Sequence, residues 1–381
     1  MFKCYLCQQD LIPQKTESKE HIIPNALGGR LLSKKLLCIH CNSTLGSSID
    51  ADLANQFNSI AAMLNIIRDD GTPKAFDAQM EGGGEKYKIE PGGKPRLLKP
   101  EIERDTSTIK IKADSVEQIK TILEREQKRG RYLNLNLNID NIINKIKEYI
   151  EDGKLSTERY LNEPLTFDMQ PGGVGFWRAI CKIATNFYIF SGEDNQHISH
   201  LIPYIKCGIQ PSRLYAYFFN RDNLFPRYLE ADLIIHSLYL KSEPATKSIY
   251  MLIELFSTFQ FVVLLSDKYN GQEFKHLYSY NVLERKYLDV NYNLEISLDE
   301  INQALSGKFD DLIFSKKNNE LLGFIHKKQI LDHLNELNIS TINNVLSQVP
   351  EGELIPKEVW NSLFEQIALN SIQVQLRQII R

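Results

Sequence analysis

The sequence predicts an α+β protein with a small cysteine-rich segment and a larger mixed body. Three observations lead to this prediction. Four of the six cysteines lie within the first 41 residues, residues 231–296 are rich in β-branched and aromatic side chains, and helical patterns return toward the C-terminus. At about 100–200 residues per domain, 381 residues accommodate two or three domains. We predict a small domain at 1–58, a linker with a small β/α region at 59–160, and a mixed α/β domain at 161–381.

The composition excludes several classes of protein. Hydrophobic residues make up 43% of the chain and charged residues 24%, which is typical of a globular protein and excludes a disordered or fibrous one. Lys plus Arg total 45 and Asp plus Glu total 48, so the net charge is −3. A protein that coats nucleic acid by phosphate attraction alone would be strongly basic. Any nucleic-acid site in this chain must therefore be local.

The sequence predicts a cytoplasmic protein that makes no membrane contact. The N-terminus, MFKCYLCQQDLIP, lacks the apolar segment and small-residue cleavage site of a secretory signal. The most apolar stretch, Ile249–Leu265, is interrupted by Glu254 and Gln260, whereas a membrane helix needs about 20 mostly apolar residues. In a reducing compartment, clustered cysteines are more often metal ligands than disulfides.

The region before residue 130 combines helical and strand patterns. A helix-like run extends from about residue 42 to residue 57. Residues 81–100 contain a linker and a hairpin whose turn is Pro91-Gly92-Gly93. A capping box at Ser115 predicts a helix that extends to about Lys128.

The middle of the chain predicts one strand and two helices. Residues 133–140 alternate strictly between apolar and polar side chains, which predicts a half-buried strand. Isoleucines at helical spacing between Ile139 and Ile150 predict a helix. The apolar run Phe176–Phe190 predicts another helix, entered through Pro171-Gly172-Gly173.

The last 150 or so residues predict paired strands followed by helices. Residues 231–296 contain several apolar runs, including the stretch from His276 to Ile296, that are typical of strands. Ser297 and Glu300 begin a helix that Gly307 ends. About three amphipathic helical segments then follow up to the C-terminus.

The clustered cysteines form two pairs with the spacing of a zinc site. Cys4-x2-Cys7 and Cys38-x2-Cys41 each place two thiols on a tight turn, and four thiolates in a tetrahedron suit Zn²⁺. A closed site of four thiolates is structural, because no open position is left for water. In a segment this small, the metal would supply much of the folding free energy. The paired spacing makes four unrelated buried cysteines the weaker alternative.

The segment between the cysteine pairs carries residues suited to metal-dependent hydrolysis. Glu20 precedes His21, and Asn42 follows the last cysteine at the start of the predicted helix. Carboxylate and amide oxygens are hard ligands for Mg²⁺ or Mn²⁺, and a histidine can act as general base on water. Neighbours on a strand point to opposite faces. Convergence of Glu20 and His21 therefore requires an irregular or strongly twisted backbone.

Residues 1–55 resemble the HNH endonuclease family, of the type whose ββα-metal motif is braced by a Cys4 zinc. The resemblance rests on EHIIP and Gly-Gly between the two CxxC pairs, with Asn directly after the second pair. It implies that Glu20 and Asn42 hold a catalytic divalent ion, Mg²⁺ or another such as Mn²⁺ or Ni²⁺, on the scissile phosphate. It also implies that His21 activates water. Waters and phosphate oxygens would complete the shell of this metal.

Three positions depart from the pattern of the family. Glu20 stands where Asp or His is common. Asn42 replaces the last His, as it does in the HNH domains of CRISPR nucleases. Ser33 stands at the middle Asn, which in the family holds the loop that carries the base. Asn25 and Ser33 are the candidates for that role here.

Basic residues after the Gly-Gly turn are candidates for substrate binding. Arg30, Lys34 and Lys35 could contact phosphates and position the strand. A solvated basic face is an equally good alternative for these three residues.

The leading functional hypothesis is a divalent-metal-dependent endonuclease that cuts DNA, in bacterial defence or restriction. One alternative is a zinc-braced nucleic-acid-binding or interaction module with a degenerate nuclease site. Another alternative keeps the nuclease but makes RNA the substrate. From its size alone, we expect the body to select the target, to sense a trigger, or to form a homo-oligomer or bind a partner protein.

Overall fold

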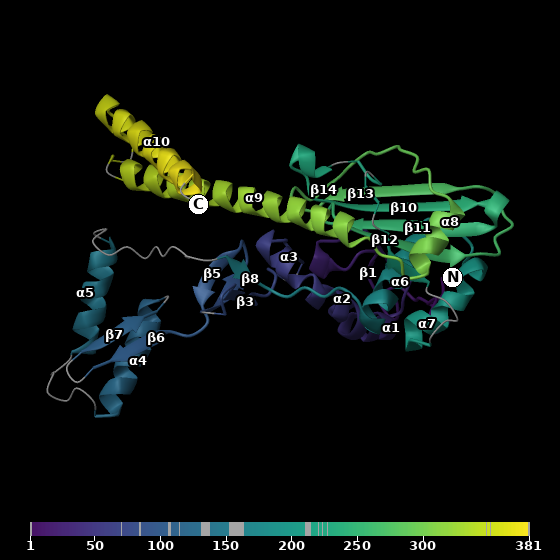
Figure 1. Ribbon diagram of the computed structural model, residues 1–381, viewed down its shortest axis with the longest axis horizontal. Helices are drawn as coiled ribbons and strands as arrows, with labels where there is room; N and C mark the ends of the chain where they lie inside the picture. Colours follow the sequence, from purple (N-terminus) through teal and green to yellow (C-terminus); the bar gives the residue numbers. More distant parts are fainter. Residues whose placement is uncertain are drawn as a thin grey trace. The chain divides into compact units, whose positions relative to one another are not determined.

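A computed structural model of the chain has an α+β architecture, as the sequence predicts (Figure 1). The structure describes residues 2–69, 71–83, 85–105, 108–113, 115–130, 138–151, 164–209, 215–219, 221–222, 224–226, 228–347, 349–350 and 352–379. The chain forms two compact units. The first contains residues 1–25, 29–52 and 172–381, and the second contains residues 26–28 and 53–171. The three-part division into domains of different function stays a prediction.

The N-terminal segment contains a short hairpin followed by a helix. Strands β1 (Glu20–His21) and β2 (Leu32–Ser33) pair antiparallel, with the 3₁₀ turn η1 (Asn25–Leu27) between them in sequence. Helix α1 (Ile39–Leu45) continues through the π-helical turn η2 (Gly46–Asp50) into α2 (Ala51–Gln56). This confirms the helical run predicted from residue 42 onward. Hydroxyl groups that donate to carbonyl oxygens one turn earlier accompany the π turn.

Helix α6 (Gly173–Phe190) is the central helix of the first unit and confirms the predicted apolar helix. It is buried on almost every side, because apolar residues occupy most of its faces. Gly175 allows close approach to the start of α2, since a Cβ atom there would overlap the Asp52 carboxylate. The turn η3 (Asn195–Leu201) and helix α7 (Ile202–Cys207) follow α6.

Six antiparallel strands form one sheet in the order β14-β13-β10-β11-β12-β9, which confirms the predicted strand-rich block. The strands are β9 (Ala216–Phe218), β10 (Ile235–Glu243), β11 (Ser248–Leu255), β12 (Phe259–Ser266), β13 (Lys275–Asn281) and β14 (Lys286–Tyr287). The turns η4 (Tyr228–Ala231) and η5 (Pro244–Thr246) lie in the connections. One expectation is corrected, because residues 288–296 form a loop and not a strand.

The sheet is covered on both faces, as expected when both faces of its strands are apolar. One face packs against α6, where the rings of Phe176 and Phe261 lie 5.7 Å apart. The other face carries Tyr239, Leu252 and Val262 in one hydrophobic cluster with residues of α8 (Leu298–Leu305). The β-rich block is therefore a sandwiched core layer, with α6 on the face opposite α8.

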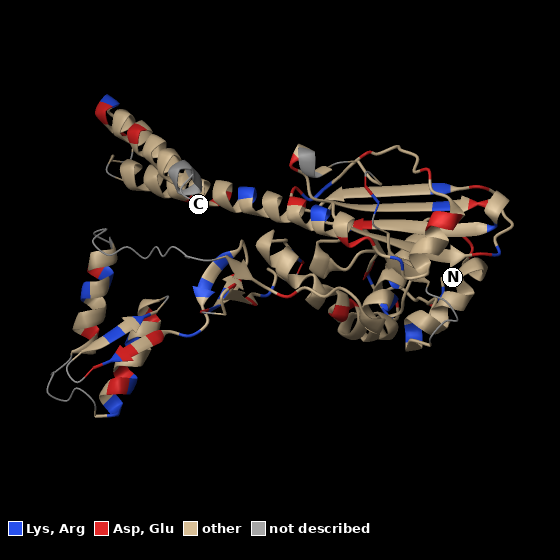
Figure 2. Ribbon diagram, viewed as in Figure 1, with Lys and Arg blue, Asp and Glu red and all other residues tan. Residues whose placement is uncertain are grey.

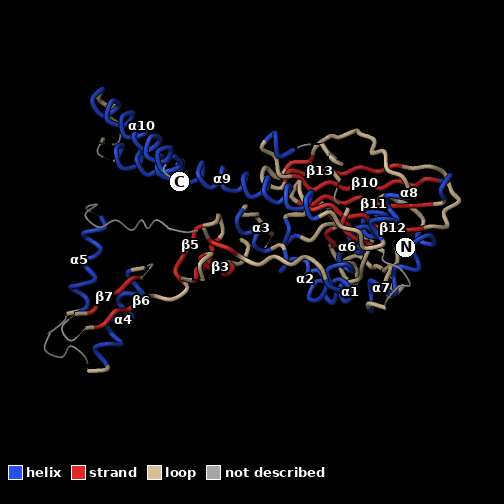
Figure 3. Tube along the Cα trace, viewed as in Figure 1, coloured by secondary structure: helices blue, strands red, loops and turns tan. Residues whose placement is uncertain are grey.

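The C-terminal region contains α8 and two long helices. Helix α8 begins at the predicted capping box of Ser297 and Glu300. Two helices follow, α9 (Asp311–Leu346) and α10 (Lys357–Ile379), in place of the three or so segments expected (Figure 3). They pack against each other, and the Asn370 amide donates a hydrogen bond of 3.2 Å to Asn338. Helix α9 is 36 residues long, so it spans more than one of the predicted segments.

The described residues of the second unit form two small sheets and several helices. Its four-stranded sheet has the order β5-β4-β3-β8, and β6 pairs with β7. The elements are α3 (Asn58–Met63), β3 (Phe76–Met80), β4 (Lys86–Glu90), β5 (Lys94–Leu97), β6 (Glu101–Arg104), β7 (Ile109–Lys112), α4 (Val116–Lys128), α5 (Ile139–Glu151) and β8 (Leu165–Thr166). The predicted hairpin turn joins β4 to β5, and Ser115 caps α4 as predicted.

One predicted strand in this unit cannot be compared in full. Most of the alternating segment 133–140 lies outside the described residues, and its last two residues already belong to α5. Acidic and basic side chains are interleaved on β6, β7 and α4 (Figure 2). This part of the chain therefore carries charges of both signs. In the described part of the chain, no helix is both long and apolar enough to cross a membrane.

A row of buried polar side chains crosses the α8-facing side of the large sheet. Strand pairing places Ser279 beside Ser237, Ser237 beside Glu254, and Glu254 beside Gln260. All four are buried, and the Gln260 amide donates a hydrogen bond of 2.7 Å to Glu254. Burial raises the pKa of the Glu254 carboxyl to about 7, although Lys317 and Gln260 oppose this shift. Glu254 therefore titrates near neutral pH.

We expect stability to fall as the pH rises through the titration of Glu254. The folded state keeps the Glu254 proton up to about pH 7, whereas the usual pKa is 4.5, so the folded state binds more protons between these values. At about 1.36 kcal/mol per pKa unit, Glu254 alone makes the free energy of unfolding about 3 kcal/mol lower above pH 7 than below pH 4.5. Urea unfolding from pH 4.5 to 8 measures this slope.

Glu254→Gln should flatten that slope, and the exposed Glu284→Gln serves as the control. An unchanged slope in Glu254→Gln would assign the pH dependence to other groups.

Candidate active site

The four N-terminal cysteines converge on one point. The sulfur atoms of Cys4, Cys7, Cys38 and Cys41 all lie within 4.8 Å of one another. The sulfurs of Cys7 and Cys38 are 3.7 Å apart, close to the edge of about 3.8 Å that Zn–S bonds of about 2.3 Å give in a tetrahedron. The donor set and its spacing are consistent with a structural zinc. Burial raises the pKa of Cys41, whereas hydrogen bonds from Gln9 and neighbouring thiols outweigh burial and lower the pKa of Cys7.

The cysteine cluster fixes both ends of the segment that carries the candidate catalytic residues. The Cys38 thiol caps the N-terminus of α1 by accepting from the amide of Cys41. The amide of Tyr5 donates to the carbonyl of Leu36, which joins the first cysteine turn to the segment that leads into the second. Helix α1 therefore starts inside the cluster, and its first turn is held in place.

The β1–β2 hairpin presents Glu20 and His21 to opposite sides. Glu20 pairs with Ser33 and His21 with Leu32 in a regular antiparallel register, so alternation sends the two side chains apart. Gly29 permits the tight return between the strands, because a Cβ atom there would lie 1.9 Å from the carbonyl oxygen of Ile23. The irregular backbone that would let Glu20 and His21 converge is not present in this hairpin.

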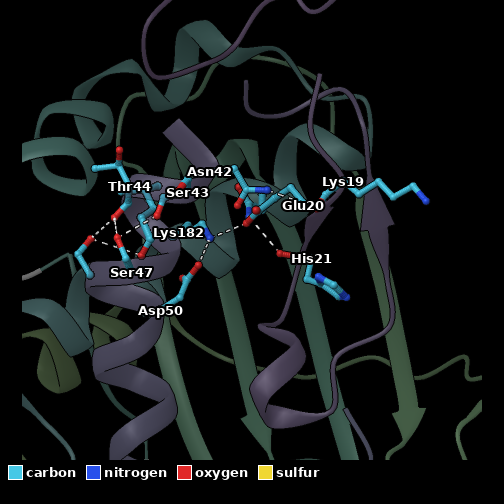
Figure 4. Close-up of polar contacts among 12 residues, drawn as sticks. Lys19, Glu20, His21, Asn42, Ser43, Thr44, Ser47, Asp50 and Lys182 are labelled. Carbon is cyan, nitrogen blue, oxygen red and sulfur yellow. Dashed lines mark hydrogen bonds and ion pairs between the residues drawn. The ribbon is translucent and has the colours of Figure 1, made fainter. Parts of the chain in front are cut away.

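The Glu20 carboxylate is bound by a lysine from α6. The Lys182 ammonium lies 2.5 Å from Glu20 and 2.5 Å from Asp50, at the end of η2 (Figure 4). The side chains of Glu20 and Lys182 are each only 3% exposed. The Asn186 amide donates a further hydrogen bond of 2.9 Å to Glu20. Glu20 of β1 and Asp50 of η2 are thus both bound to α6.

Two carboxylates share one ammonium in this cluster. Burial by itself lowers the pKa of Lys182, but the carboxylates of Asp50 and Glu20 outweigh it and raise that pKa above its usual value. Burial raises the pKa of Glu20, and the second carboxylate of Asp50 adds to this effect against the attraction of Lys182. The cluster therefore has more acidic than basic groups. It also joins the cysteine turn to α6, because the Tyr5 hydroxyl donates a hydrogen bond of 2.9 Å to Asn186.

His21 lies half-buried on the other side of β1. Its carbonyl accepts from the Asn186 amide at 3.5 Å, while its imidazole points away from the cluster of Glu20, Asp50 and Lys182 (Figure 4). Burial, together with the nearby cations Arg30 and Lys182, lowers the pKa of His21 below its usual value. A neutral imidazole at pH 7 is the form that can accept a proton.

Asn42 lies in the first turn of α1, next to β1. Its amide nitrogen donates a hydrogen bond of 3.3 Å to the carbonyl of Lys19, the residue before Glu20 (Figure 4). The cysteine-anchored helix thus brings Asn42 beside the Glu20–His21 strand. Ser33, at the position of the family's middle Asn, faces the same side as Glu20, and its hydroxyl accepts from the amide of Lys35.

The three predicted phosphate-binding residues have different surroundings. Lys34 forms an exposed ion pair of 2.8 Å with Glu17. The Lys35 ammonium lies over the Phe2 ring, 4.5 Å from its centroid. The Arg30 carbonyl accepts a hydrogen bond of 3.5 Å from the hydroxyl of Tyr287 on β14. Arg30 is therefore next to both His21 and the edge of the large sheet.

The sequence interpretation missed Lys182, Asn186 and Asp50. Lys182 and Asn186 are four residues apart on a helix whose other buried positions are almost all apolar. Polar residues at this spacing lie on one helical face, so their pairing on an apolar helix was the available signal. Their partners belong to distant elements, and the sequence pattern alone does not identify them.

The donor chemistry around Glu20 fits a divalent cation on one condition. Carboxylate oxygens of Glu20 and Asp50 and the amide oxygen of Asn42 are the ligand types that Mg²⁺ prefers. The second oxygen of Asp50 is buried and, among the described residues, has no hydrogen-bond partner. Lys182 already holds Glu20 with a single positive charge. A divalent cation could bind Glu20 only if this ammonium moves away.

Comparisons with known proteins place the N-terminal segment in a family. Residues 4–58 match the family model described as HNH endonuclease. The chain is also 31% identical over 126 residues to an "Endoplasmic reticulum-resident calcium binding protein" of Plasmodium falciparum (isolate 3D7), a match that covers 29% of this chain and 36% of that protein. The matched part of this chain therefore spans well under two thirds of the length of that protein. No solved structure matches the chain.

Proposed function

We propose that this protein is a metal-dependent endonuclease that cuts DNA, acting through the HNH endonuclease domain that residues 4–58 form. One observation carries the proposal: a helix that starts inside the cysteine cluster brings Asn42 into hydrogen-bond contact with the strand that carries Glu20 and His21. A nuclease also agrees with the nearly neutral charge of the chain, because a metal-assisted site needs only a local basic patch.

In this proposal His21 is the general base. A water molecule attacks the phosphorus atom, its proton passes to the imidazole of His21, and the bond from phosphorus to the 3′ oxygen breaks. The neutral state of His21 that follows from its lowered pKa suits this role. Arg30, beside His21, is suited to contact the phosphate through its guanidinium group.

Glu20 and Asn42 are the proposed ligands of the catalytic divalent ion. When bound, such an ion stabilises negative charge on the phosphate and on the leaving oxygen. Lys182 and Asp50 enter this proposal as residues that set the charge around Glu20. Lys34 and Lys35 are proposed to hold phosphates that flank the cleavage site. Target selection, sensing or oligomerisation remains the proposed task of the body.

Cleavage of supercoiled plasmid tests the proposal. The full chain is incubated with Mg²⁺, Mn²⁺ or Ni²⁺, and nicked and linear products are followed over time. We expect cleavage by the wild type and a loss of at least about 100-fold in His21→Ala, because general bases contribute about 10²–10⁴-fold. His326→Ala, on the exposed side of α9, is the matched control and should keep full activity. Equal nicking by all three proteins would reject His21 as the base.

The binding module with a degenerate site is the second candidate, and the Glu20–Lys182 contact favours it. A carboxylate that is buried against an ammonium resembles a structural brace more than an open metal site. Plasmid binding that survives His21→Ala, with no cleavage by the wild type under any metal, would select this candidate. Cleavage of an RNA transcript but not of plasmid would instead select the RNA nuclease.

A further inference from the structure

An open groove of about 490 Å³ borders the hairpin of the HNH domain. Its walls come from the hairpin and from the C-terminal end of α6. The lining residues are Lys19, Leu32, Ser33, Lys34, Lys35, Ile189 and Phe190. Both walls belong to the first compact unit. The groove combines three lysines with an apolar wall.

The groove lies at the end of the hairpin opposite its turn, and its lining takes residues from both faces of the hairpin: Leu32, the partner of His21, and Ser33, the partner of Glu20. His21 pairs with Leu32 across the strands, so these two side chains share a face. Lys19 directly precedes β1 and Lys34 directly follows β2, so both lysines are within two residues of the His21–Leu32 pair. The side chains of Lys19 and His21 both point away from the Glu20–Lys182 cluster (Figure 4).

The chemistry of the groove matches a nucleic-acid strand. Lys19 is exposed, Lys34 pairs with the half-buried Glu17, and Lys35 lies over the Phe2 ring. Among the ion pairs of the described residues, only Lys34 of these three lysines is paired with a carboxylate, and this excess of positive charge favours a polyanion. Phe190 is 43% exposed and stacks on Phe187 at an interplanar angle of 18°. An aromatic ring that is supported from behind and open in front is a platform for a base.

We propose that this groove binds single-stranded DNA, with an unpaired base stacked on Phe190 and its phosphates along Lys19, Lys34 and Lys35. In a fully paired duplex the bases stack on one another and present no free face to Phe190. The preferred substrate is therefore DNA with unpaired nucleotides beside the cleavage site. The claim that the bound strand is a substrate rests on the proposed nuclease function. Binding of the strand itself can be measured without cleavage.

Fluorescence anisotropy of a labelled oligonucleotide tests the groove. The protein is the full-length His21→Ala chain with no added divalent metal, and the probes are a single strand and the duplex of the same sequence. We expect the single strand to bind more tightly than the duplex. Stacking is worth about 1–3 kcal/mol per base, so Phe190→Ala should weaken single-strand binding by about 5-fold to 150-fold. Phe190→Trp should retain it, and Phe364→Ala, exposed on α10, is the matched control.

The lysines contribute to strand binding through their charge, and the salt dependence of the affinity measures this contribution. Lys19→Ala should reduce the slope of log affinity against log salt by about 1, the value for the loss of one phosphate contact. Phe190→Ala should leave that slope unchanged. The groove is rejected if Phe190→Ala binds the single strand like Phe364→Ala, or if the duplex binds as tightly as the single strand.

The two proposals fail independently of each other. Strand binding that depends on Phe190, together with no plasmid cleavage, would reject the nuclease and keep the groove. Cleavage that depends on His21, with binding indifferent to Phe190, would keep the nuclease and reject the groove.

Discussion

Lys182→Met is expected to lower the free energy of unfolding by about 3–5 kcal/mol, because removal of one partner from a buried ion pair leaves an uncompensated charge. Lys182 is fully enclosed between Glu20 and Asp50, with a distance of 2.5 Å to each. Without it, the buried Glu20 carboxylate and the partly exposed Asp50 carboxylate lose the cation that they share, and the Asn186 amide still donates to Glu20. Urea unfolding followed by circular dichroism measures the loss.

An exposed lysine provides the control for this substitution. Lys316 forms an ion pair of 3.2 Å with Asp222, and both side chains are largely accessible. Exposed pairs contribute less than about 1 kcal/mol, so Lys316→Met should unfold nearly like the wild type. If Lys182→Met loses no more stability than Lys316→Met, the buried cluster does not stabilise the fold. Glu20→Gln with Asp50→Asn in the Lys182→Met background should recover much of the loss, because no buried charge then remains.

The same variant tests whether Glu20 can hold a divalent ion. In Lys182→Met, Mg²⁺ or Mn²⁺ is free to take the position of the ammonium beside two carboxylates. A cation that binds only the folded state stabilises it by about 2.7 kcal/mol at 100 times its dissociation constant. We therefore expect added metal to raise the melting temperature of Lys182→Met more than that of the wild type. Failure of both metals to do so would count against Glu20 as a metal ligand, whatever the outcome of cleavage assays.

Loss of the zinc is the second large effect that we expect. Cys38 contributes both a thiolate and the N-cap of α1, so Cys38→Ser should release the metal and free the helix that carries Asn42. Structural zinc binds with apparent free energies of about 10–16 kcal/mol in zinc-finger peptides, which is as large as the whole stability of a typical domain, about 5–15 kcal/mol. We expect less than one zinc per chain and rapid amide exchange across the first 50 or so residues. Metal analysis and hydrogen exchange provide these measurements.

Cys207→Ser distinguishes the cluster from the other thiols. Cys207 is exposed at the end of α7, not buried as an ordinary core thiol would be. Its replacement should leave both zinc content and exchange unchanged. Retention of a full equivalent of zinc by Cys38→Ser would contradict a site built from all four cysteines.

Much of the fold follows from short-range patterns in the sequence. The two CxxC pairs predict one metal site, and the structure brings their four sulfur atoms together. The structure also has the helix cap at Ser297 and the hairpin turn at Pro91-Gly92-Gly93 at the predicted positions. Helix α6 was predictable from its length and apolar character. The helix, the cap and the turn each depend on contiguous residues, so local sequence suffices for them. The two cysteine pairs are 30 residues apart, and their joining into one site was predicted from the ligand chemistry of zinc.

The candidate site was predictable only in part. The sequence by itself determined the paired cysteines, the family of the segment 4–58 and the presence of Glu20, His21 and Asn42 within that segment. Only the tertiary structure decided that the hairpin register separates Glu20 from His21, and that Lys182 and Asn186 from α6 bind the Glu20 carboxylate. The partner of a buried charge depends on which elements the topology packs together. Local spacing carries no information about that partner when it comes from a helix far along the chain.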